Sequence, residues 1–161
     1  MREKLDILLQ SEESVRIISI VVIVFCISAV IIGIVSLIKR YLRNRPKHFD
    51  NLEGHEFEYY CADLLRNKGF VEVEVTKGSG DYGADILAEK DGVTYAIQCK
   101  CYTAPIGVKA IQEAHAGRDY YDRMVGAVLT NQYFTKPAVE AARKLKILLW
   151  DRGYLESMLE E

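Results

Sequence analysis

An acid, an amide and a lysine in the middle of this sequence have the chemistry of a metal-assisted site. Asp85 ends the segment GDYGAD, and Gln98 and Lys100 belong to the short motif Gln-Cys-Lys. Mg²⁺ takes hard oxygen ligands such as carboxylate and amide oxygens, and a nearby ammonium group can stabilise negative charge at phosphorus. Brought together, these three side chains would suit Mg²⁺-assisted hydrolysis of a phosphodiester.

A hairpin is the element that would bring them together. Two strand-like runs, residues 85–89 and 93–100, flank a turn that contains Asp91 and Gly92. Asp-Gly favours a two-residue turn because both positions need φ > 0. Asp85 then lies directly across from the glutamine, with Cβ atoms about 5 Å apart. Since side chains alternate along a strand, the glutamine and the lysine point to the same face.

The rest of the second half of the chain alternates helix and strand. An amphipathic helix is expected over residues 52–68, with Gly69 ending it. Its apolar stripe consists of Phe57, Cys61, Leu64 and Leu65. The other expected elements are strands over 71–75, 125–130 and 147–150 and helices over 109–124, 136–146 and 154–160. The first of these strands alternates Val with Glu, which predicts one wet face, and the last reads as buried. This order predicts an α/β domain whose mixed sheet is covered on both faces.

The segment 17–38 consists of apolar or small residues and has no charged residue. At about 1.5 Å per residue, a helix of this length covers the roughly 30 Å of a bilayer core. We therefore expect a single membrane-spanning helix. A buried helix of a soluble domain would have a polar face, and a cleaved signal peptide would have a shorter apolar run nearer the start of the chain.

The flanks of this segment predict its orientation. Five basic residues follow it in the linker 39–48, whereas the tail 1–16 has three basic residues and four acidic ones. The positive-inside rule places the N-terminus outside and the following domain in the cytoplasm of a single-pass membrane protein. The basic linker also suits lipid headgroups or, less readily, nucleic acid.

Two motifs are set aside as cofactor or metal sites. The string GSGDYG, residues 78–83, matches the G-x-G-x-x-G pattern of dinucleotide-binding proteins, but a strand rather than a helix is expected after it. We expect no nucleotide cofactor, and we expect the glycines to form a bent loop that brings backbone close to a ligand. Cysteines 99 and 101 are too close in sequence for a zinc site, so we expect the cysteines to be reduced and structural.

Several motifs together resemble one family. LEGHEFE at residues 52–58, GDYGAD at 80–85 and Gln-Cys-Lys at 98–100 occur in the order and spacing of the Mrr-like restriction endonucleases, which are PD-(D/E)xK nucleases. Weaker similarity continues to about residue 159. The resemblance implies a three-layer α/β/α restriction-endonuclease-like fold over residues 49–161. It also implies Mg²⁺-dependent hydrolysis of DNA, with Mn²⁺ as a substitute, in restriction of foreign or modified DNA.

The resemblance also implies a role for each site residue. Asp85 would be the central metal ligand and Gln98 a neutral ligand, with the backbone carbonyl of Cys99 beside them. Lys100 would orient or deprotonate the attacking water and stabilise charge in the transition state. Glu58 would complete the metal shell. Helical periodicity alone does not choose between Glu56 and Glu58, and only the family pattern prefers the second.

The charge of the domain limits how it can bind DNA. Residues 49–161 have 13 Lys and Arg against 19 Asp and Glu, a net charge of −6. Because phosphate neutralisation supplies most non-specific affinity, the basic residues must be concentrated on one side, or membrane tethering must substitute for affinity. The expected DNA contacts, beside Lys100 and Arg123, are Lys77, Ser79, Lys109 and Arg118.

Three alternatives stay open at this point. The domain could be a catalytically silent nuclease fold that binds nucleic acid or a protein partner at the membrane, and its acidic charge favours that alternative. Cleavage of RNA is the second, since metal-assisted hydrolysis does not itself distinguish the sugar. One site cuts one strand, so double-strand cleavage would need a homodimer or two successive events.

Overall fold

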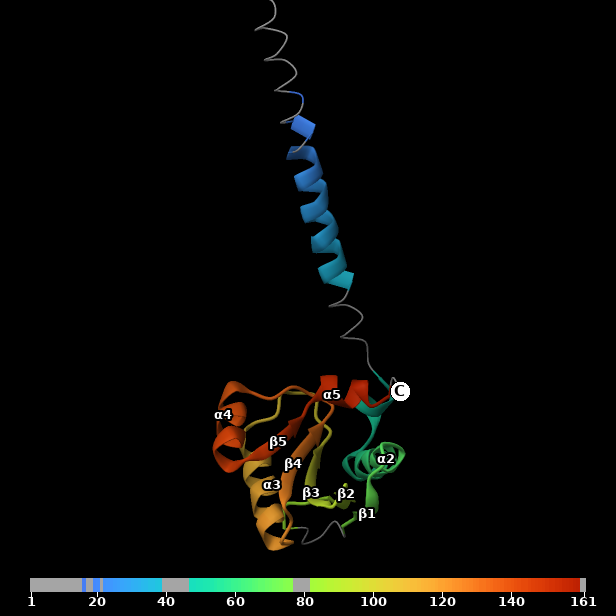
Figure 1. Ribbon diagram of the computed structural model, residues 1–161, viewed down its shortest axis with the longest axis vertical. Coiled ribbons are helices and arrows are strands. Elements are labelled where there is room, and N and C mark those ends of the chain that lie inside the picture. Colours follow the sequence, from blue (N-terminus) through green and yellow to red (C-terminus); the bar gives the residue numbers. More distant parts are fainter. Residues whose placement is uncertain (1–15, 17–18, 21, 39–46, 77–81, 160–161) are drawn as a thin grey trace, which may run out of the picture. The chain divides into compact units, whose positions relative to one another are not determined.

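The computed structural model describes residues 16, 19–20, 22–38, 47–76 and 82–159 (Figure 1). The chain divides into two compact units, residues 1–45 and 46–161. The candidate site residues belong to the second unit. The two units are described separately.

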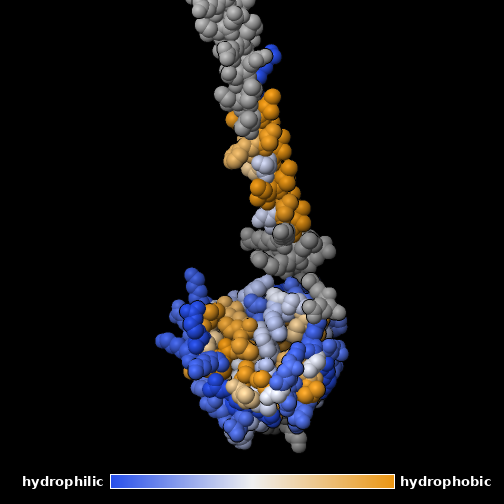
Figure 2. All heavy atoms as spheres, viewed as in Figure 1, coloured by the Kyte–Doolittle hydropathy of each residue, from blue (hydrophilic) through white to orange (hydrophobic). Residues whose placement is uncertain are grey.

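In the first unit, residues 22–38 are helical and their side chains are exposed, most of them apolar (Figure 2). No helix in the described part of the chain combines the length and the apolar character needed to cross a membrane. The structure therefore does not support the predicted span over residues 17–38. Residues 17, 18 and 21 lie outside the described residues, so the continuous described helix is shorter than the predicted one.

The second unit contains one five-stranded sheet in the order β1-β2-β3-β4-β5. Its strands are β1 (Val71–Val75), β2 (Ile86–Lys90), β3 (Val93–Lys100), β4 (Val125–Thr130) and β5 (Ile147–Trp150). The first three strands are antiparallel neighbours, whereas β3, β4 and β5 run parallel to one another. The predicted mixed sheet is confirmed.

The hairpin that carries the candidate site has the predicted register. Lys90 pairs with Val93 and Ile86 pairs with Ile97. Asp91 and Gly92 have φ values of 53° and 76°, as a turn with two left-handed central residues requires. The turn therefore sets which residues of β2 and β3 face each other, up to the start of β2.

Helices cover both faces of the sheet (Figure 1). They are α2 (Gly54–Asn67), α3 (Val108–Tyr120), α4 (Lys136–Leu145) and α5 (Arg152–Ser157), and a short 3-10 helix, η1 (His48–Asn51), precedes them. Side chains of α2 and α5 share one apolar core with Ala127 and Leu129 of β4. Side chains of α3 and α4 share a second core with Val128. Alternation along β4 thus separates the two helical layers of the α/β/α fold.

The ends of α2 follow from its sequence. A capping box joins Glu53 and Glu56 at the first turn, and Gly69 adopts φ 80° after the last one. The Phe70 amide donates to the Leu65 carbonyl at 3.1 Å and closes the helix. The predicted apolar stripe is buried, since its four members are at most 7% exposed.

Two details of the sheet differ from prediction. The Val–Glu alternation of β1 breaks because Glu72 has φ 50° and the pairing with β2 is irregular there, which leaves Val71 55% exposed. The last strand, β5, is only partly buried, because it lies at the edge of the sheet and Leu148 is 44% exposed.

Candidate active site

The carboxylate of Asp85 lies at the centre of the candidate site. Asp85 directly precedes β2. Its backbone N–H donates to the Ile97 carbonyl at 2.9 Å, and its backbone carbonyl accepts from the Thr76 amide at 2.8 Å. The side chain is buried, and Oδ2 accepts hydrogen bonds from the Gln98 Nε2 group and, at 2.6 Å, from the Cys99 backbone amide. The predicted pairing of the acid with the glutamine is present.

The Gln98 amide indicates where a cation would fit. Its Nε2 group contacts Asp85 Oδ2 and lies 3.5 Å from the Cys99 carbonyl oxygen. The Asp85 carboxylate and the Cys99 carbonyl, both predicted as metal ligands, therefore face the same Nε2 group of Gln98. Rotation of the amide by 180° would present its oxygen at the same place. This donor set of carboxylate, carbonyl and amide oxygens fits a hard cation such as Mg²⁺.

Within the described ranges, no group of three or more His, Cys, Asp or Glu side chains is placed to hold a metal ion. A metal at this place would therefore depend on the glutamine and the backbone carbonyl as well as on acids. Mg²⁺ accepts such a set because it commonly keeps several water ligands and takes few from protein.

Lys100 forms an ion pair that the sequence did not predict. Its Nζ lies 3.0 Å from Glu113 Oε2, and the two side chains are 18% and 30% exposed. Burial disfavours the charged form of the lysine, but Glu113 and Asp85 outweigh it and raise the pKa of Lys100. The lysine is thus an ammonium group held between acids. Glu113 also lies 3.7 Å from Lys109, which precedes it by four residues on the same helix face.

Two glycines let α3 approach the segment that leads into Asp85. Gly83 has φ 95°, and a Cβ there would overlap the backbone oxygen of Glu113. A Cβ on Gly117 would in turn overlap the Gly83 carbonyl. We expected the glycine-rich loop to bring backbone close to a ligand, but the close contact of Gly83 is with α3. This contact brings the helix that carries Glu113 against the segment that carries the acid.

The structure distinguishes the two acids of α2. The Glu56 carboxylate accepts from the Glu53 backbone amide at 3.1 Å, so it caps the helix and is exposed. The Glu58 carboxylate is 18% exposed and lies 2.7 Å from His55 Nδ1. Glu56 is thus engaged in the helix cap, and Glu58 is the more buried of the two acids.

The buried Cys99 thiol is affected by the charges of both Asp85 and Glu58. The pKa of the Cys99 thiol is well above its usual value because of a hydrogen bond to Cys61 and burial, and the charges of Asp85 and Glu58 add to the effect. Both acids therefore act on the same buried sulfur. Cys61 and Cys99 are buried free thiols, as predicted.

Of the four predicted DNA contacts, the structure describes Lys109 and Arg118. Lys77 and Ser79 lie outside the described residues. Lys109 is 88% exposed, as a phosphate contact would be. Arg118 is different, because its side chain is 18% exposed and donates to the Leu145 carbonyl at 3.0 Å and to Asp119 at 2.8 Å. Its guanidinium group holds the end of α4, where a cation also stabilises the helix dipole.

Comparison with known families gives one match, to the family Mrr_cat, described as restriction endonuclease, over residues 49–159. The chain belongs to this restriction endonuclease family. The match includes the hairpin, α2 and α3, and so every described residue of the candidate site. A comparison with curated proteins gave no match.

Solved structures with a similar fold include the protein of unknown function AF1548, with 25% identity over 67% of this chain and a TM-score of 0.57. The DNA modification-dependent restriction endonuclease AspBHI is 19% identical over 64% of this chain, with a TM-score of 0.50. The chain aligns with 66% of AF1548 and 30% of AspBHI, so it spans part of each protein. The second likeness shows the restriction-endonuclease fold.

Proposed function

We propose that residues 49–161 form a Mg²⁺-dependent endonuclease domain that hydrolyses phosphodiester bonds of DNA. The observation that carries this proposal is the group formed by Asp85, Gln98 and Lys100 on one hairpin of a chain in a restriction endonuclease family. Family membership favours DNA over RNA as the substrate. Restriction of foreign or modified DNA is the corresponding biological role.

The proposed ligands of the metal are Asp85, the side-chain oxygen of Gln98, the Cys99 carbonyl and Glu58. When bound, Mg²⁺ would supply Lewis-acid polarisation of the phosphate and a water of lowered pKa. The Asp85 carboxylate is held in place for this role by the Cys99 amide at 2.6 Å. Mn²⁺ prefers similar ligands and would substitute.

The charge of Lys100 supports one of the two roles that the family resemblance implies. Because Glu113 and Asp85 raise its pKa, the side chain is protonated at neutral pH. An ammonium group has no lone pair with which to accept a proton from water. We therefore assign Lys100 to orienting the water and stabilising negative charge on the phosphate.

Membrane attachment stays a separate proposal that rests on the sequence. The uncharged segment 17–38 and the basic linker 39–48 support a single-pass anchor with the nuclease domain in the cytoplasm. Fractionation of cells that express the full-length chain, beside a chain that lacks residues 17–38, tests it. Recovery of both chains in the soluble fraction would exclude the anchor.

The nuclease proposal is tested by cleavage of plasmid DNA by the full-length chain with Mg²⁺ or Mn²⁺. Metal-dependent nicking that is lost in Asp85→Ala and Lys100→Ala is the expected result. If the folded protein cuts neither modified nor unmodified DNA, the silent binding module is the better description. Cleavage of RNA in preference to DNA would reassign the substrate.

A further inference from the structure

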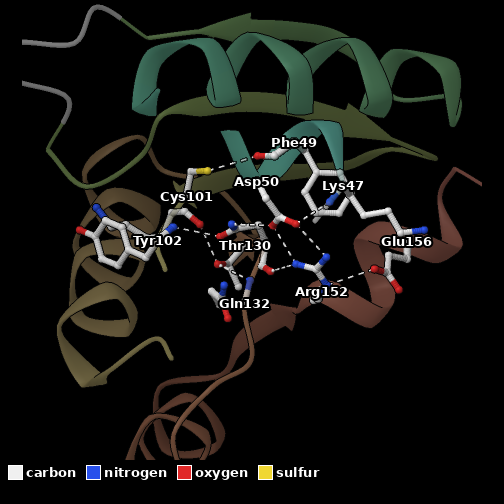
Figure 3. Close-up of polar contacts among 11 residues, drawn as sticks. Lys47, Phe49, Asp50, Cys101, Tyr102, Thr130, Gln132, Arg152 and Glu156 are labelled. Atoms are coloured by element: carbon white, nitrogen blue, oxygen red, sulfur yellow. Dashed lines mark hydrogen bonds and ion pairs between the residues drawn. The ribbon is translucent and has the colours of Figure 1, made fainter. Parts of the chain in front are cut away.

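A buried polar network joins η1, β4 and α5 beside the end of β3 (Figure 3). Asp50 of η1 and Arg152 of α5 form its centre. Arg152 donates from Nη1 to Asp50 Oδ1 at 2.7 Å and from Nη2 to Oδ2 at 2.9 Å. This two-bond geometry is the strongest form of an arginine–carboxylate contact. Arg152 is 7% exposed and the Asp50 side chain 16%, so the pair is largely shielded from water.

Asn131, directly after β4, connects this ion pair to the chain beyond β3. Its Nδ2 group donates to Asp50 Oδ1 at 3.0 Å, and its backbone oxygen accepts from Arg152 at 3.0 Å. Its side-chain oxygen accepts from the Tyr102 backbone amide at 2.9 Å. The side chain is 1% exposed and has a partner at each end. Tyr102 is thereby fixed relative to the ion pair.

Thr130 makes the corresponding contact with Lys100 itself. Its hydroxyl donates to the Lys100 carbonyl at 2.6 Å and accepts from the Gln132 amide at 3.1 Å. The side chain is fully buried. A Phe49 carbonyl beside Asp50 also accepts from Cys101 Sγ at 3.4 Å. Residues 100 to 102 are therefore all held by hydrogen bonds. Lys100 and Tyr102 bond to Thr130 and Asn131, and Cys101 bonds to Phe49 of η1.

These bonds act on the end of β3, which pairs with β4 but no longer with β2. The pairing of β2 with β3 extends to Ile97, whereas the pairing of β3 with β4 extends to Lys100 and Thr130. Beyond Ile97, strand pairing holds the β3 backbone from the β4 side, and on the other side the Cys99 amide bonds the Asp85 side chain. A shift of this backbone would move the Lys100 ammonium relative to Asp85, which belongs to the other strand of the hairpin.

We propose that the Asp50–Arg152 pair, acting through Asn131 and Thr130, positions the end of β3 so that Lys100 faces the reacting phosphate. The inference rests on the proposed nuclease function. None of the four residues touches the substrate, so they are positioning residues. Glu113 holds the side chain of Lys100, and the network holds its backbone.

The decisive variant is Thr130→Val, which removes the hydroxyl at nearly constant volume. Thr130→Ser keeps the hydroxyl and serves as the matched control. In the full-length chain we expect Thr130→Val to lower kcat by about tenfold to a hundredfold at unchanged KM, because small misplacements of catalytic groups have effects of this size. The serine variant should stay close to wild type. The affinity for Mn²⁺ alone should be equal in all three proteins.

A double-mutant cycle separates positioning of Lys100 from general loosening of the fold. In a Lys100→Ala background, Thr130→Val should cause no further loss of the residual activity, because the group that it positions is absent. A loss of the same size in both backgrounds would overturn the proposal. So would a fall in activity that follows the unfolded fraction alone.

A readout without catalysis keeps the test valid if the nuclease proposal fails. The NMR signal of the Lys100 ε-methylene, recorded without metal or DNA, should move in Thr130→Val and in Asp50→Asn. It should not move in Thr130→Ser or in the exposed control Glu140→Gln. A moved signal in a protein that cuts no nucleic acid would retain the positioning and refute the nuclease. An unmoved signal would refute the positioning.

Discussion

The active-site hairpin and the Asp50–Arg152 network are both buried polar regions, but they differ in charge balance. The network pairs Asp50 with Arg152, which also bonds Glu156 at 3.1 Å. Near the hairpin, Asp85, Glu58 and Glu113 are acids, and Glu113 pairs with both Lys100 and Lys109. The acidic excess at the hairpin suits a site that binds a metal ion, whereas the network suits a structural role.

The two regions also differ in sequence separation. The bonds to Asp85 join residues 13 and 14 positions apart, whereas Asp50 and Arg152 are 102 positions apart. A short hairpin brings its partners together by local turn geometry. The network exists only after η1, the end of β4 and α5 have come together. The following predictions test whether the hairpin supplies the chemical groups while the network supplies stability and the position of Lys100.

The largest effect is expected for Asp85→Asn, which keeps the shape of the side chain and removes the charge. Cleavage should fall by about a thousandfold or more, because the central ligand of the proposed metal loses its negative charge. Stability should change little, since an amide oxygen still accepts from the Cys99 amide. Plasmid nicking and urea unfolding measure the two quantities.

Asp91→Asn in the turn of the same hairpin is the matched control. Asparagine accepts the left-handed conformation of that position, so both activity and stability should be kept. Equal losses of activity in the two variants would show that the hairpin tolerates no change of charge, and would remove the special role of Asp85.

Unlike Asp85→Asn, Asp50→Ala should lower stability as well as cleavage. It leaves Arg152 buried without its carboxylate partner, and loss of one member of such a pair costs about 3 kcal/mol of unfolding free energy. Asp63→Ala breaks a pair of similar length, 2.7 Å, whose side chains are 74% and 46% exposed. Such surface pairs contribute about 0–1 kcal/mol. Similar losses in urea unfolding would contradict the structural role of the network.

Glu113→Gln should have an intermediate effect on catalysis. The amide can still accept a hydrogen bond from Lys100 but no longer supplies a full charge, so we expect kcat to fall by about tenfold. The exposed acid Glu140, changed to Gln, should leave kcat unaltered. Steady-state cleavage of a DNA duplex gives both values. A wild-type rate in Glu113→Gln would leave the ion pair without a role in the reaction.

The smallest effect concerns pH. Burial alone would raise the pKa of Asp50, but hydrogen bonds from Arg152, the Lys47 amide and Asn131 lower it below 3.8. A carboxylate with a lowered pKa stabilises the fold above its unfolded pKa, and this contribution is lost as the pH falls through the folded value. The stability advantage of wild type over Asp50→Asn should therefore be constant between pH 5 and pH 7 and shrink below about pH 4. Urea unfolding at several pH values measures it.

The sequence predicted those parts of the molecule that local geometry decides. Asp91 and Gly92 gave the turn, the turn gave the register, and the register placed Asp85 against Gln98. The apolar stripe of α2 and the alternation of elements gave the mixed sheet with helices on both faces. The motifs that resemble the Mrr-like endonucleases pointed to the family that the match over residues 49–159 shows.

The parts that the sequence did not predict depend on contacts between distant residues. Glu113 was not among the predicted site residues, and Arg118 was expected to contact DNA. Only the packing of α3 against β3 and α4 gives them Lys100 and Leu145 as partners. The irregular pairing at Glu72 was also not visible, because the Val–Glu pattern of β1 fits a regular strand.

The distance in sequence between Asp50 and Arg152 has a consequence for protein synthesis. A ribosome makes Asp85, Gln98 and Lys100 well before it reaches Arg152, and domains generally fold as units once their residues are available. A nascent chain that ends before α5 has the proposed metal ligands but not the ion pair that fixes the end of β3. By our proposal, cleavage activity therefore appears only when translation of the domain is nearly complete.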